Sequence, residues 1–408
     1  MNFPRVLFCI LTASFLFSPE MVKGQAVVRS IANVEKTDAD IRTGAERTEI
    51  YLPWLKGKNV AVVANQTSLI NKTHLVDTLL SLGVAVKKIF CPEHGFRGTA
   101  DDGTTVKNSI DKKSGLPIVS LYGDHYKPTA RDLKGIDVVV YDIQDVGVRF
   151  YTFVSTMSYV MEACAQQKKS FIVLDRPNPN GYYVDGPVLE LEHKSFVGMH
   201  PVPIVYGMTI AEYAQMLNGE KWLDGGIQCD LKTVPCENYL HTDWYQLPVA
   251  PSPNLPNMAA VYLYPSLCLF EGTVMSVGRG TNLPFQVVGH PRLQNAPFTF
   301  TPSPRPGAKN PLYSGQICKG HDLHNFATLY VRDYKGIYLF WLKGSYKDLP
   351  EKADFFNSYF ERLAGTGKLS QQIIEGKSEN EIRSSWQPGL DKFKAIRVKY
   401  LLYPDFAS

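Results

Sequence analysis

Residues 58–91 decide the fold class, because the run KNVAVVA at 58–64 is followed by THLVDTLLSL at 73–82 and VKKIFC at 86–91. The first and third runs are typical of buried strands, whereas the second has helical spacing and stops at Gly83. Further short strands are predicted at 116–122, 136–141 and 171–174, with helices over 129–133 and 150–168 between them. This alternation predicts βαβ units, and therefore a Rossmann-like, doubly wound α/β domain with a mostly parallel sheet.

The second half of the chain has a different character. A capping box from Thr209 to Glu212 begins a helix that is expected to end near Gly219. Proline-rich loops then alternate with short strands, and helices are predicted at 351–364 and 369–385. We therefore expect a Rossmann-like domain over 27–230 and a smaller α+β domain over 231–408.

The composition is that of an ordinary globular protein. The 408 residues include 44% hydrophobic and 20% charged side chains, enough chain for two to three domains. The 43 Lys and Arg against 39 Asp and Glu leave a net charge of +4, which is spread along the chain. This balance predicts no nucleic-acid partner.

The first 26 residues differ from the rest. Arg5 precedes an apolar run at 6–17, and a polar stretch then reaches the small residues Gly24 and Ala26. This pattern predicts a cleaved signal peptide over 1–26 and export to the periplasm. The run is too short to cross a bilayer, which takes about 20 residues, and no later segment reaches that length, so we expect no integral membrane segment.

Six cysteines follow the predicted signal peptide, at positions 91, 164, 229, 236, 268 and 318. Their spacings do not form a disulfide framework or a zinc motif, which favours buried free thiols. A bridge between Cys229 and Cys236 across a hairpin remains the alternative.

Polar side chains follow all five predicted strands. In an open parallel sheet the carboxyl ends of the strands meet at one edge, where ligands bind. A single carboxylate after a strand is often only a helix cap, but carboxylates at four of five exits favour a binding site. The candidate residues at these exits are Asn65, Gln66, Glu93, His94, Arg97, Tyr122, Asp142, Gln144, Asp145, Arg149, Asp175, Arg176 and Asn178.

Several classes of chemistry are disfavoured by missing motifs. The sequence contains no G-x-G-x-x-G, no P-loop, no H-E-x-x-H and no G-x-S-x-G. We therefore expect no cofactor and no metal. Carboxylate chemistry remains, and glycoside hydrolysis usually needs two carboxyl groups. Glu93 follows an apolar strand and is the candidate for the catalytic acid, and the alternative is that it forms a salt bridge with Arg97 or His94. Asp142 and Asp145 are candidates for the second carboxyl group, and the alternative is that one of them caps the next helix.

Seven blocks of the sequence resemble the exo-β-N-acetylmuramidases of the NamZ type, glycoside hydrolase family 171. The blocks are FCPEHGFRG (90–98), YDIQDVGVRFYT (141–152), DRPNP (175–179), GP (186–187), PVPIVYGMT (201–209), PSPNLP (251–256) and GRGT (278–281). The resemblance implies a Rossmann-like domain followed by a smaller domain, and release of N-acetylmuramic acid from the non-reducing ends of peptidoglycan fragments. It also implies that Glu93 is the catalytic residue.

A muramic acid carries a lactyl carboxylate, which an arginine can bind with two parallel hydrogen bonds. Arg149 is the first choice for this role because it follows the acidic loop, and the other options are Arg97, Arg176 and Arg279. Further candidate sugar contacts are Tyr122, Tyr151, Asn254 and Tyr264.

Two other functions fit the same residues. One is a muropeptide-binding protein without turnover, and the other is a hydrolase of amide or ester bonds in wall fragments. The sequence carries no signal for the oligomeric state.

Overall fold

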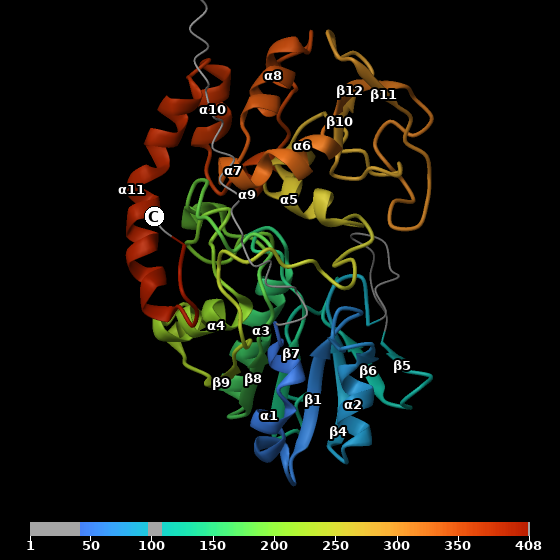
Figure 1. Ribbon diagram of the computed structural model, residues 1–408, viewed down its shortest axis with the longest axis vertical. Coiled ribbons are helices and arrows are strands. Elements are labelled where there is room, and N and C mark those ends of the chain that lie inside the picture. The colour runs from blue at the N-terminus through green and yellow to red at the C-terminus, as the bar shows by residue number, and fades with distance from the viewer. Residues whose placement is uncertain (1–40, 97–107, 407–408) are drawn as a thin grey trace, which may run out of the picture. The chain divides into compact units, whose positions relative to one another are not determined.

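A seven-stranded sheet forms the centre of the first half of the chain (Figure 1). The computed structural model describes residues 41–96 and 108–406, so the predicted signal peptide and Arg97 lie outside the described residues. The strand order is β5-β6-β4-β1-β7-β8-β9, and β5 alone runs antiparallel to its neighbour. The strands are β1 (Asn59–Ala64), β4 (Ala85–Cys91), β5 (Ser109–Ile110), β6 (Pro117–Ser120), β7 (Val138–Asp142), β8 (Ser170–Leu174) and β9 (Asp230–Val234), and a separate hairpin is formed by β2 (Leu69–Ile70) and β3 (Thr73–His74).

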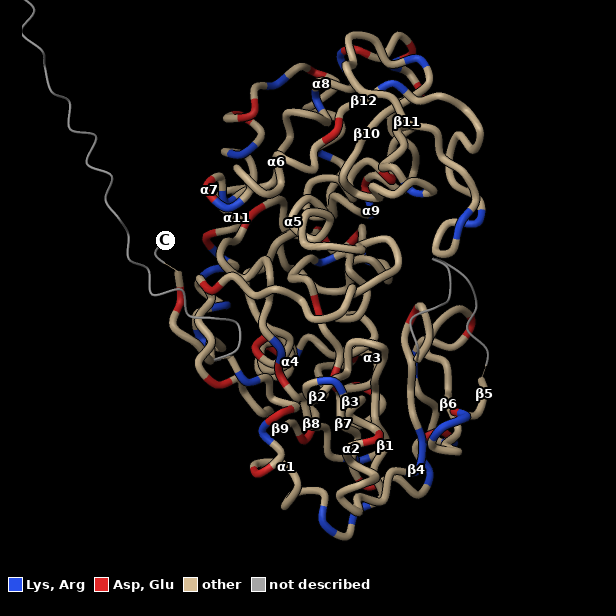
Figure 2. Tube along the Cα trace, turned by 45° about the vertical axis from the view of Figure 1, so that its right-hand side comes forward, with Lys and Arg blue, Asp and Glu red and all other residues tan. Residues whose placement is uncertain are grey.

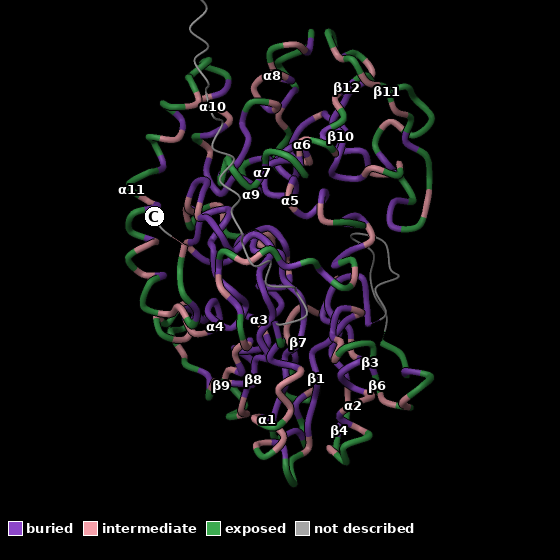
Figure 3. The backbone as a smooth tube through the Cα atoms, viewed as in Figure 1, coloured by how far each residue is buried: buried purple, intermediate pink, exposed green. Residues whose placement is uncertain are grey.

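Helices cover both faces of this sheet. Successive side chains of a strand point to opposite faces, and in β1 Val60 and Val62 pack with α1 (Thr48–Leu55) and α2 (Leu75–Ser81). Ala61 and Val63 belong instead to the core on the other face, with α3 (Phe153–Gln166) and α4 (Ile210–Gly219). Because both faces are covered, β1, β7 and β8 are buried almost throughout (Figure 3). The predicted doubly wound, mostly parallel sheet is confirmed.

The second half contains a smaller antiparallel sheet of order β10-β12-β11, and the helices of this half lie to its left in Figure 1. Its elements are α5 (Met258–Leu267), β10 (Val287–His290), β11 (Phe298–Phe300), β12 (Cys318–Asp322), α6 (His324–Leu329), α7 (Val331–Tyr334), α8 (Phe340–Asp348), α9 (Phe360–Ala364), α10 (Lys368–Ile374) and α11 (Glu379–Arg397). The predicted α+β character of this half is confirmed.

Three predicted helices differ in the structure. Residues 129–133 form only a turn, which Gly135 ends with a φ of 75°. The helix predicted at 351–364 is reduced to α9, because the chain before it pairs with another segment: Val274 N donates to Phe355 O at 3.0 Å and Asn357 N donates to Gly272 O at 2.9 Å. The helix predicted at 369–385 is divided into α10 and α11, because Ser378 begins a new helix with its own capping box.

The strand β9 was not predicted from the sequence. Its residues DLKTV alternate between exposed and partly buried positions, so it lacks the apolar run of the inner strands. It pairs in parallel with β8 and extends the first sheet to Val234.

Other features of the described residues follow the sequence more closely. All six cysteines outside the predicted signal peptide are buried free thiols, as predicted. Lys and Arg are interspersed with Asp and Glu along the described chain (Figure 2). No described helix has the length and apolar character needed to cross a membrane.

Candidate active site

A cavity of about 250 Å³ lies beyond the carboxyl ends of β4 and β6. Its walls come from both halves of the chain. Six residues predicted from the sequence line it: Glu93, His94, Tyr122, Tyr151, Asn254 and Arg279. Tyr264, also predicted from the sequence, lines the cavity as well, and four further lining residues were not predicted: Thr152, Glu271, Phe285 and Tyr359.

Glu93 stands in a tight turn directly after β4. Gly95 N donates to Pro92 O at 3.1 Å, and His94 has a φ of 67°, which is uncommon for a residue with a side chain. The Glu93 residue is 9% exposed, and its Oε2 accepts a hydrogen bond from Thr152 Oγ1 at 3.2 Å. Thr152 immediately precedes α3, so the start of this helix fixes the carboxyl group at the cavity wall. A partly buried carboxyl facing a cavity suits a general acid.

Aromatic side chains form a second wall. The ring of Tyr264 lies 5.4 Å from that of Phe150, 5.9 Å from that of Tyr151 and 5.0 Å from that of Phe285, measured between centroids and in each case edge to face. Tyr151 is fixed at its other end, because its hydroxyl donates to Pro251 O at 2.8 Å. Apolar walls with a few placed polar groups are the usual composition of a small-molecule site.

A second carboxylate, Glu271, lines the cavity from the short helix η5 (Cys268–Gly272). Its Oε1 accepts from Arg279 Nε at 2.6 Å, and its Oε2 lies 3.6 Å from the Cys268 thiol. Burial raises the pKa of the Cys268 thiol well above its usual range, so the thiol stays protonated and donates. The sequence does carry a signal for this residue, since Glu271 is the only acidic residue between Asp243 and Asp322.

Asp142, a candidate partner of Glu93, does not line the cavity. Both of its carboxylate oxygens are bound by Arg176, with Nε at 2.6 Å from Oδ1 and Nη2 at 2.9 Å from Oδ2. Both side chains are buried, and Arg176 Nη2 also donates to Leu69 O at 3.0 Å. The pair therefore joins the ends of β7 and β8, and it offers neither a catalytic carboxylate nor a receptor for lactate.

Asp145, the other candidate partner, is also buried within the protein. Its Oδ2 accepts from the Tyr206 hydroxyl and from Gly147 N, the latter at 2.8 Å. Its Oδ1 has no hydrogen-bond partner among the residues that the structure describes. Burial raises the pKa of this carboxyl to about 6, against the hydrogen bonds that lower it.

The raised pKa of Asp145 predicts a pH-dependent loss of stability. Between about pH 4 and pH 6 the unfolded chain releases this proton while the folded chain keeps it, so the free energy of unfolding falls as the pH rises. Asp145→Asn keeps an oxygen that accepts from Tyr206 and Gly147 but cannot ionise. We expect the free energy of unfolding of the variant, measured relative to that of the wild type, to rise on the order of 2 kcal/mol from pH 4 to pH 8. Denaturant unfolding at several pH values checks this, and a difference that does not change with pH would contradict it.

Arg149, the first choice for lactate, lies away from the cavity. Its Nη1 donates to Pro187 O and Val202 O at 2.9 and 2.7 Å, and its Nη2 donates to Leu363 O and Ala364 O at 2.9 and 2.8 Å. The residue is 1% exposed. Its guanidinium binds carbonyl groups from three segments of the chain. The prediction that Arg149 contacts the sugar is therefore corrected.

The remaining predicted residues bind other parts of the protein. Asn65 Oδ1 accepts from Thr67, Gln66 donates to Pro251 O, Gln144 donates to Pro177 O, Asp175 accepts from Thr209, Ala211 and Tyr403, and Asn178 donates to Met208 O. The polar exits of β1, β7 and β8 thus mainly bind one another and the loops that cover them. The exits of β4 and β6 are the ones that reach the cavity.

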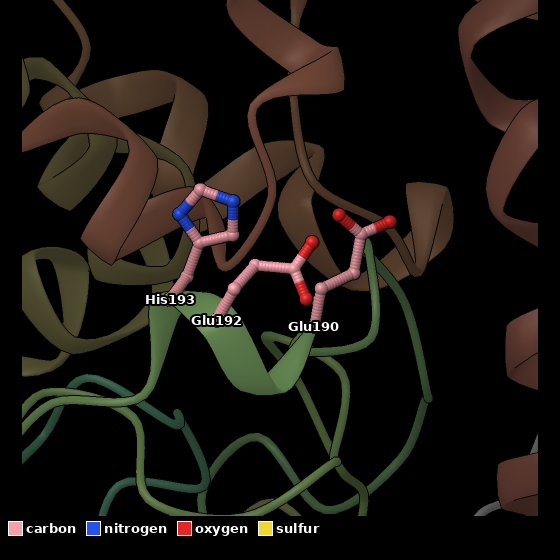
Figure 4. Close-up of side chains that lie close together, drawn as sticks. All are labelled: Glu190, Glu192 and His193. Atoms are coloured by element: carbon pink, nitrogen blue, oxygen red, sulfur yellow. The ribbon is translucent and has the colours of Figure 1, made fainter.

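Three side chains of the kinds that bind metals gather at the short helix η3 (Leu191–His193), which Glu190 directly precedes. Glu190, Glu192 and His193 come within 4.8 Å of one another (Figure 4). Glu190 binds Lys368 Nζ at 2.5 Å and Thr366 Oγ1 at 2.9 Å. These bonds join η3 to the start of α10, which accounts for the position of Glu190 without an ion.

Comparison with known proteins places the chain in a family. The sequence model of the N-terminal domain of the exo-β-N-acetylmuramidase NamZ matches residues 60–259, and that of its C-terminal domain matches residues 262–403. The chain belongs to the NamZ family. The resemblance read from the sequence blocks is therefore confirmed.

Individual members of the family are similar over almost the whole chain. The peptidoglycan β-N-acetylmuramidase NamZ of Bacillus subtilis (strain 168) is 35% identical, and the alignment covers 98% of this chain and 100% of that protein. Two crystal structures of DUF1343 family proteins from Bacteroides fragilis NCTC 9343 share the fold. One is 48% identical with a TM-score of 0.84, covering 90% of this chain and 99% of that one. The other is 30% identical with a TM-score of 0.74, covering 89% and 99%.

Proposed function

We propose that this protein releases N-acetylmuramic acid from the non-reducing ends of peptidoglycan fragments, with Glu93 as the catalytic acid. As a member of the NamZ family the chain is a glycosidase, and its identity to a peptidoglycan β-N-acetylmuramidase supports muramidase activity. One observation carries the assignment of the acid: Glu93 is a partly buried carboxyl group, fixed by Thr152, on the wall of an aromatic cavity.

The chemistry assigned to Glu93 is proton transfer. Its carboxyl proton passes to the glycosidic oxygen while the bond between that oxygen and the anomeric carbon breaks. Water then supplies the hydroxyl group that the anomeric carbon gains, and the remaining proton of that water restores the carboxyl group. Asp142 and Asp145 are not assigned this role, because they are bound inside the protein by Arg176 and Tyr206. Among the described lining residues, Glu271 is the other carboxylate.

The test is product analysis with a defined disaccharide. Purified protein is incubated with N-acetylmuramic acid linked β-1,4 to N-acetylglucosamine, and the products are identified by mass spectrometry. We expect the two free sugars. The reversed disaccharide, in which the muramic acid stands at the reducing end, is the control and should remain intact.

Two outcomes would favour other functions. Binding of the disaccharide without any release of sugar would indicate a muropeptide-binding protein. Cleavage of the stem peptide from a disaccharide-peptide, with the disaccharide left whole, would indicate a hydrolase of amide bonds.

We further propose that the protein is exported and acts in the periplasm. The support for this proposal is the pattern of Arg5 and the apolar run at 6–17. N-terminal sequencing of the protein from a periplasmic fraction tests it, and recovery of the intact N-terminus from the cytoplasm would contradict it.

A further inference from the structure

A second cavity lies between the loop at 187–190 and the helices α10 and α11. Its volume is about 260 Å³, against about 250 Å³ for the cavity that Glu93 lines, which we call the Glu93 cavity. No described residue lines both cavities. The proposed reaction at Glu93 therefore leaves a second space of the same size without a role.

The charges in the second cavity are paired. Among the described residues that line it, Glu190 and Lys368 are the only charged ones. Glu190 Oε1 accepts from Lys368 Nζ at 2.5 Å, and its Oε2 accepts from Thr366 Oγ1 at 2.9 Å. The described lining thus carries no net charge, which favours an uncharged polar ligand over an anion or a cation.

Part of the wall is apolar. Leu189, Leu369 and Trp386 line the second cavity and belong to the hydrophobic core. Trp386 is also held by Arg383, whose guanidinium carbon lies 5.7 Å from a ring centroid of the indole and whose Nη1 binds Asp185 at 2.8 Å. An apolar wall beside a few polar groups suits a ligand that has both kinds of surface. A pyranose ring is such a ligand, because its C–H groups are apolar and its hydroxyl groups are polar.

The second cavity also has polar groups that a ligand can bind. Gln372 and Trp386 line it, and neither the Gln372 amide nor the Trp386 indole N–H has a hydrogen-bond partner within 41–96 and 108–406. The Ser385 hydroxyl donates to Ile382 O at 2.6 Å, so its oxygen can still accept a bond. The hydroxyl and acetamido groups of an N-acetylated sugar both donate and accept hydrogen bonds, and they match these three groups.

The sequence of α11 is unfavourable for a helix beside the second cavity. Pro388 and Gly389 lie inside α11, where proline lacks the N–H of the helical hydrogen bond and glycine is a poor helix former. Gly389 lines the cavity, and a Cβ atom there would lie 3.3 Å from Cγ2 of Val188, which lines it too. Glycine at this position therefore keeps the cavity open, although it weakens the helix.

The second cavity and the Glu93 cavity are neighbours. Residues 187–190 line the second cavity and 196–197 the Glu93 cavity, while Thr366 lines the second cavity and Leu363 the Glu93 cavity. The two segments are joined by a hydrogen bond from Glu190 N to Gly365 O at 2.8 Å. Neighbouring sites for units of one polymer bind it more tightly than either site alone.

We propose that the second cavity is an additional saccharide site, which binds an uncharged N-acetylglucosamine unit of the wall glycan through Gln372, Ser385 and Trp386. This inference rests on the proposed function for the kind of glycan. A peptide ligand would bring an ionised terminus, for which the described lining has no unpaired charge. The site holds the polymer, whereas the bond is broken at Glu93.

The test is fluorine NMR of protein labelled with 5-fluorotryptophan. The chain has five tryptophans, of which Trp386 alone lines the second cavity and none lines the Glu93 cavity. The probe is the β-1,4-linked tetramer of N-acetylglucosamine, which contains no muramic acid and is not cleaved under the proposed function. Trp386→Phe identifies the resonance of Trp386. We expect this resonance to shift on addition of the tetramer until the site is saturated, and the other four to stay in place.

Three variants locate the binding. Gln372→Ala should weaken the affinity measured from the Trp386 resonance about 3- to 10-fold, which corresponds to one hydrogen bond. Gln371→Ala is the matched control and should leave it unchanged, because Gln371 binds Glu375 at 2.9 Å and does not line the cavity. Gly389→Leu should abolish the shift, because its side chain occupies the cavity. Thermal melting checks that the variants fold, and Gln372→Ala decides the test if the leucine variant does not.

The outcomes separate this inference from the proposed function. If the protein releases muramic acid but the Trp386 resonance does not move at about 10 mM tetramer, ten times a weak dissociation constant of about 1 mM, the inference is wrong and the function stands. If the resonance shifts as expected but no glycosidic bond is cleaved, the function is wrong and the inference stands. A shift caused by a stem peptide and not by the tetramer would show that the ligand is a peptide, which contradicts the inference. An equal loss of affinity in Gln371→Ala and Gln372→Ala would contradict the location of the site.

Discussion

Glu93→Gln is expected to lower kcat for the disaccharide by roughly two to four orders of magnitude, which is the usual contribution of a general acid. Glutamine has nearly the same shape and can still accept the hydrogen bond from Thr152, so the fold and sugar binding should be preserved. It has no proton to give to the leaving oxygen. The loss should therefore fall on kcat, with little change in the affinity for N-acetylmuramic acid.

The leaving group distinguishes acid catalysis from a structural effect. A nitrophenolate leaves without much help from an acid, whereas a sugar hydroxyl does not. The variant should accordingly lose much less activity on a nitrophenyl N-acetyl-β-muramide than on the disaccharide. Glu192→Gln, at an exposed glutamate outside the cavity, is the control. Near wild-type turnover of the disaccharide by Glu93→Gln would exclude Glu93 as the acid.

The second large effect is expected at Arg149, on stability rather than on rate. Arg149→Met removes the donors for four buried carbonyl groups, those of Pro187, Val202, Leu363 and Ala364. Unpaired buried acceptors are costly, and the free energy of unfolding should fall on the order of 4 kcal/mol. Burial lowers the pKa of Arg149 to about 9, so the guanidinium is still protonated near pH 7.

Guanidinium chloride unfolding of the variant and the wild type measures this loss. Arg131→Met, at an exposed arginine, is the control and should change stability by less than about 0.5 kcal/mol. If Arg149→Met unfolded like the wild type but lost its preference for muramic acid over N-acetylglucosamine, Arg149 would be the lactate receptor after all, and its four carbonyl contacts would be of little consequence.

The sheet could be predicted from the sequence because its inner strands carry a continuous apolar run. The residues of β1 and β7 are buried on both faces, and this requirement is visible in the sequence around Val62 and Val140. The edge strand β9 has exposed positions, where apolar side chains are not needed. Its sequence therefore resembles that of a loop.

The candidate site could be predicted only in part. Glu93 and Asp142 both follow an apolar strand, and nothing in their immediate neighbours distinguishes a carboxyl group that faces a cavity from one that is bound inside the protein. The difference arises from distant residues: Arg176 covers Asp142, whereas Thr152 leaves Glu93 at the cavity wall. Likewise the partners of Arg149 lie up to 215 positions away along the chain.

The walls of the Glu93 cavity come from two separate stretches of sequence. Glu93 lies in the stretch matched by the N-terminal family model, and Arg279 in the stretch matched by the C-terminal one. The part of the wall that comes from the later stretch can therefore change between homologues while Glu93, the proposed acid, is retained.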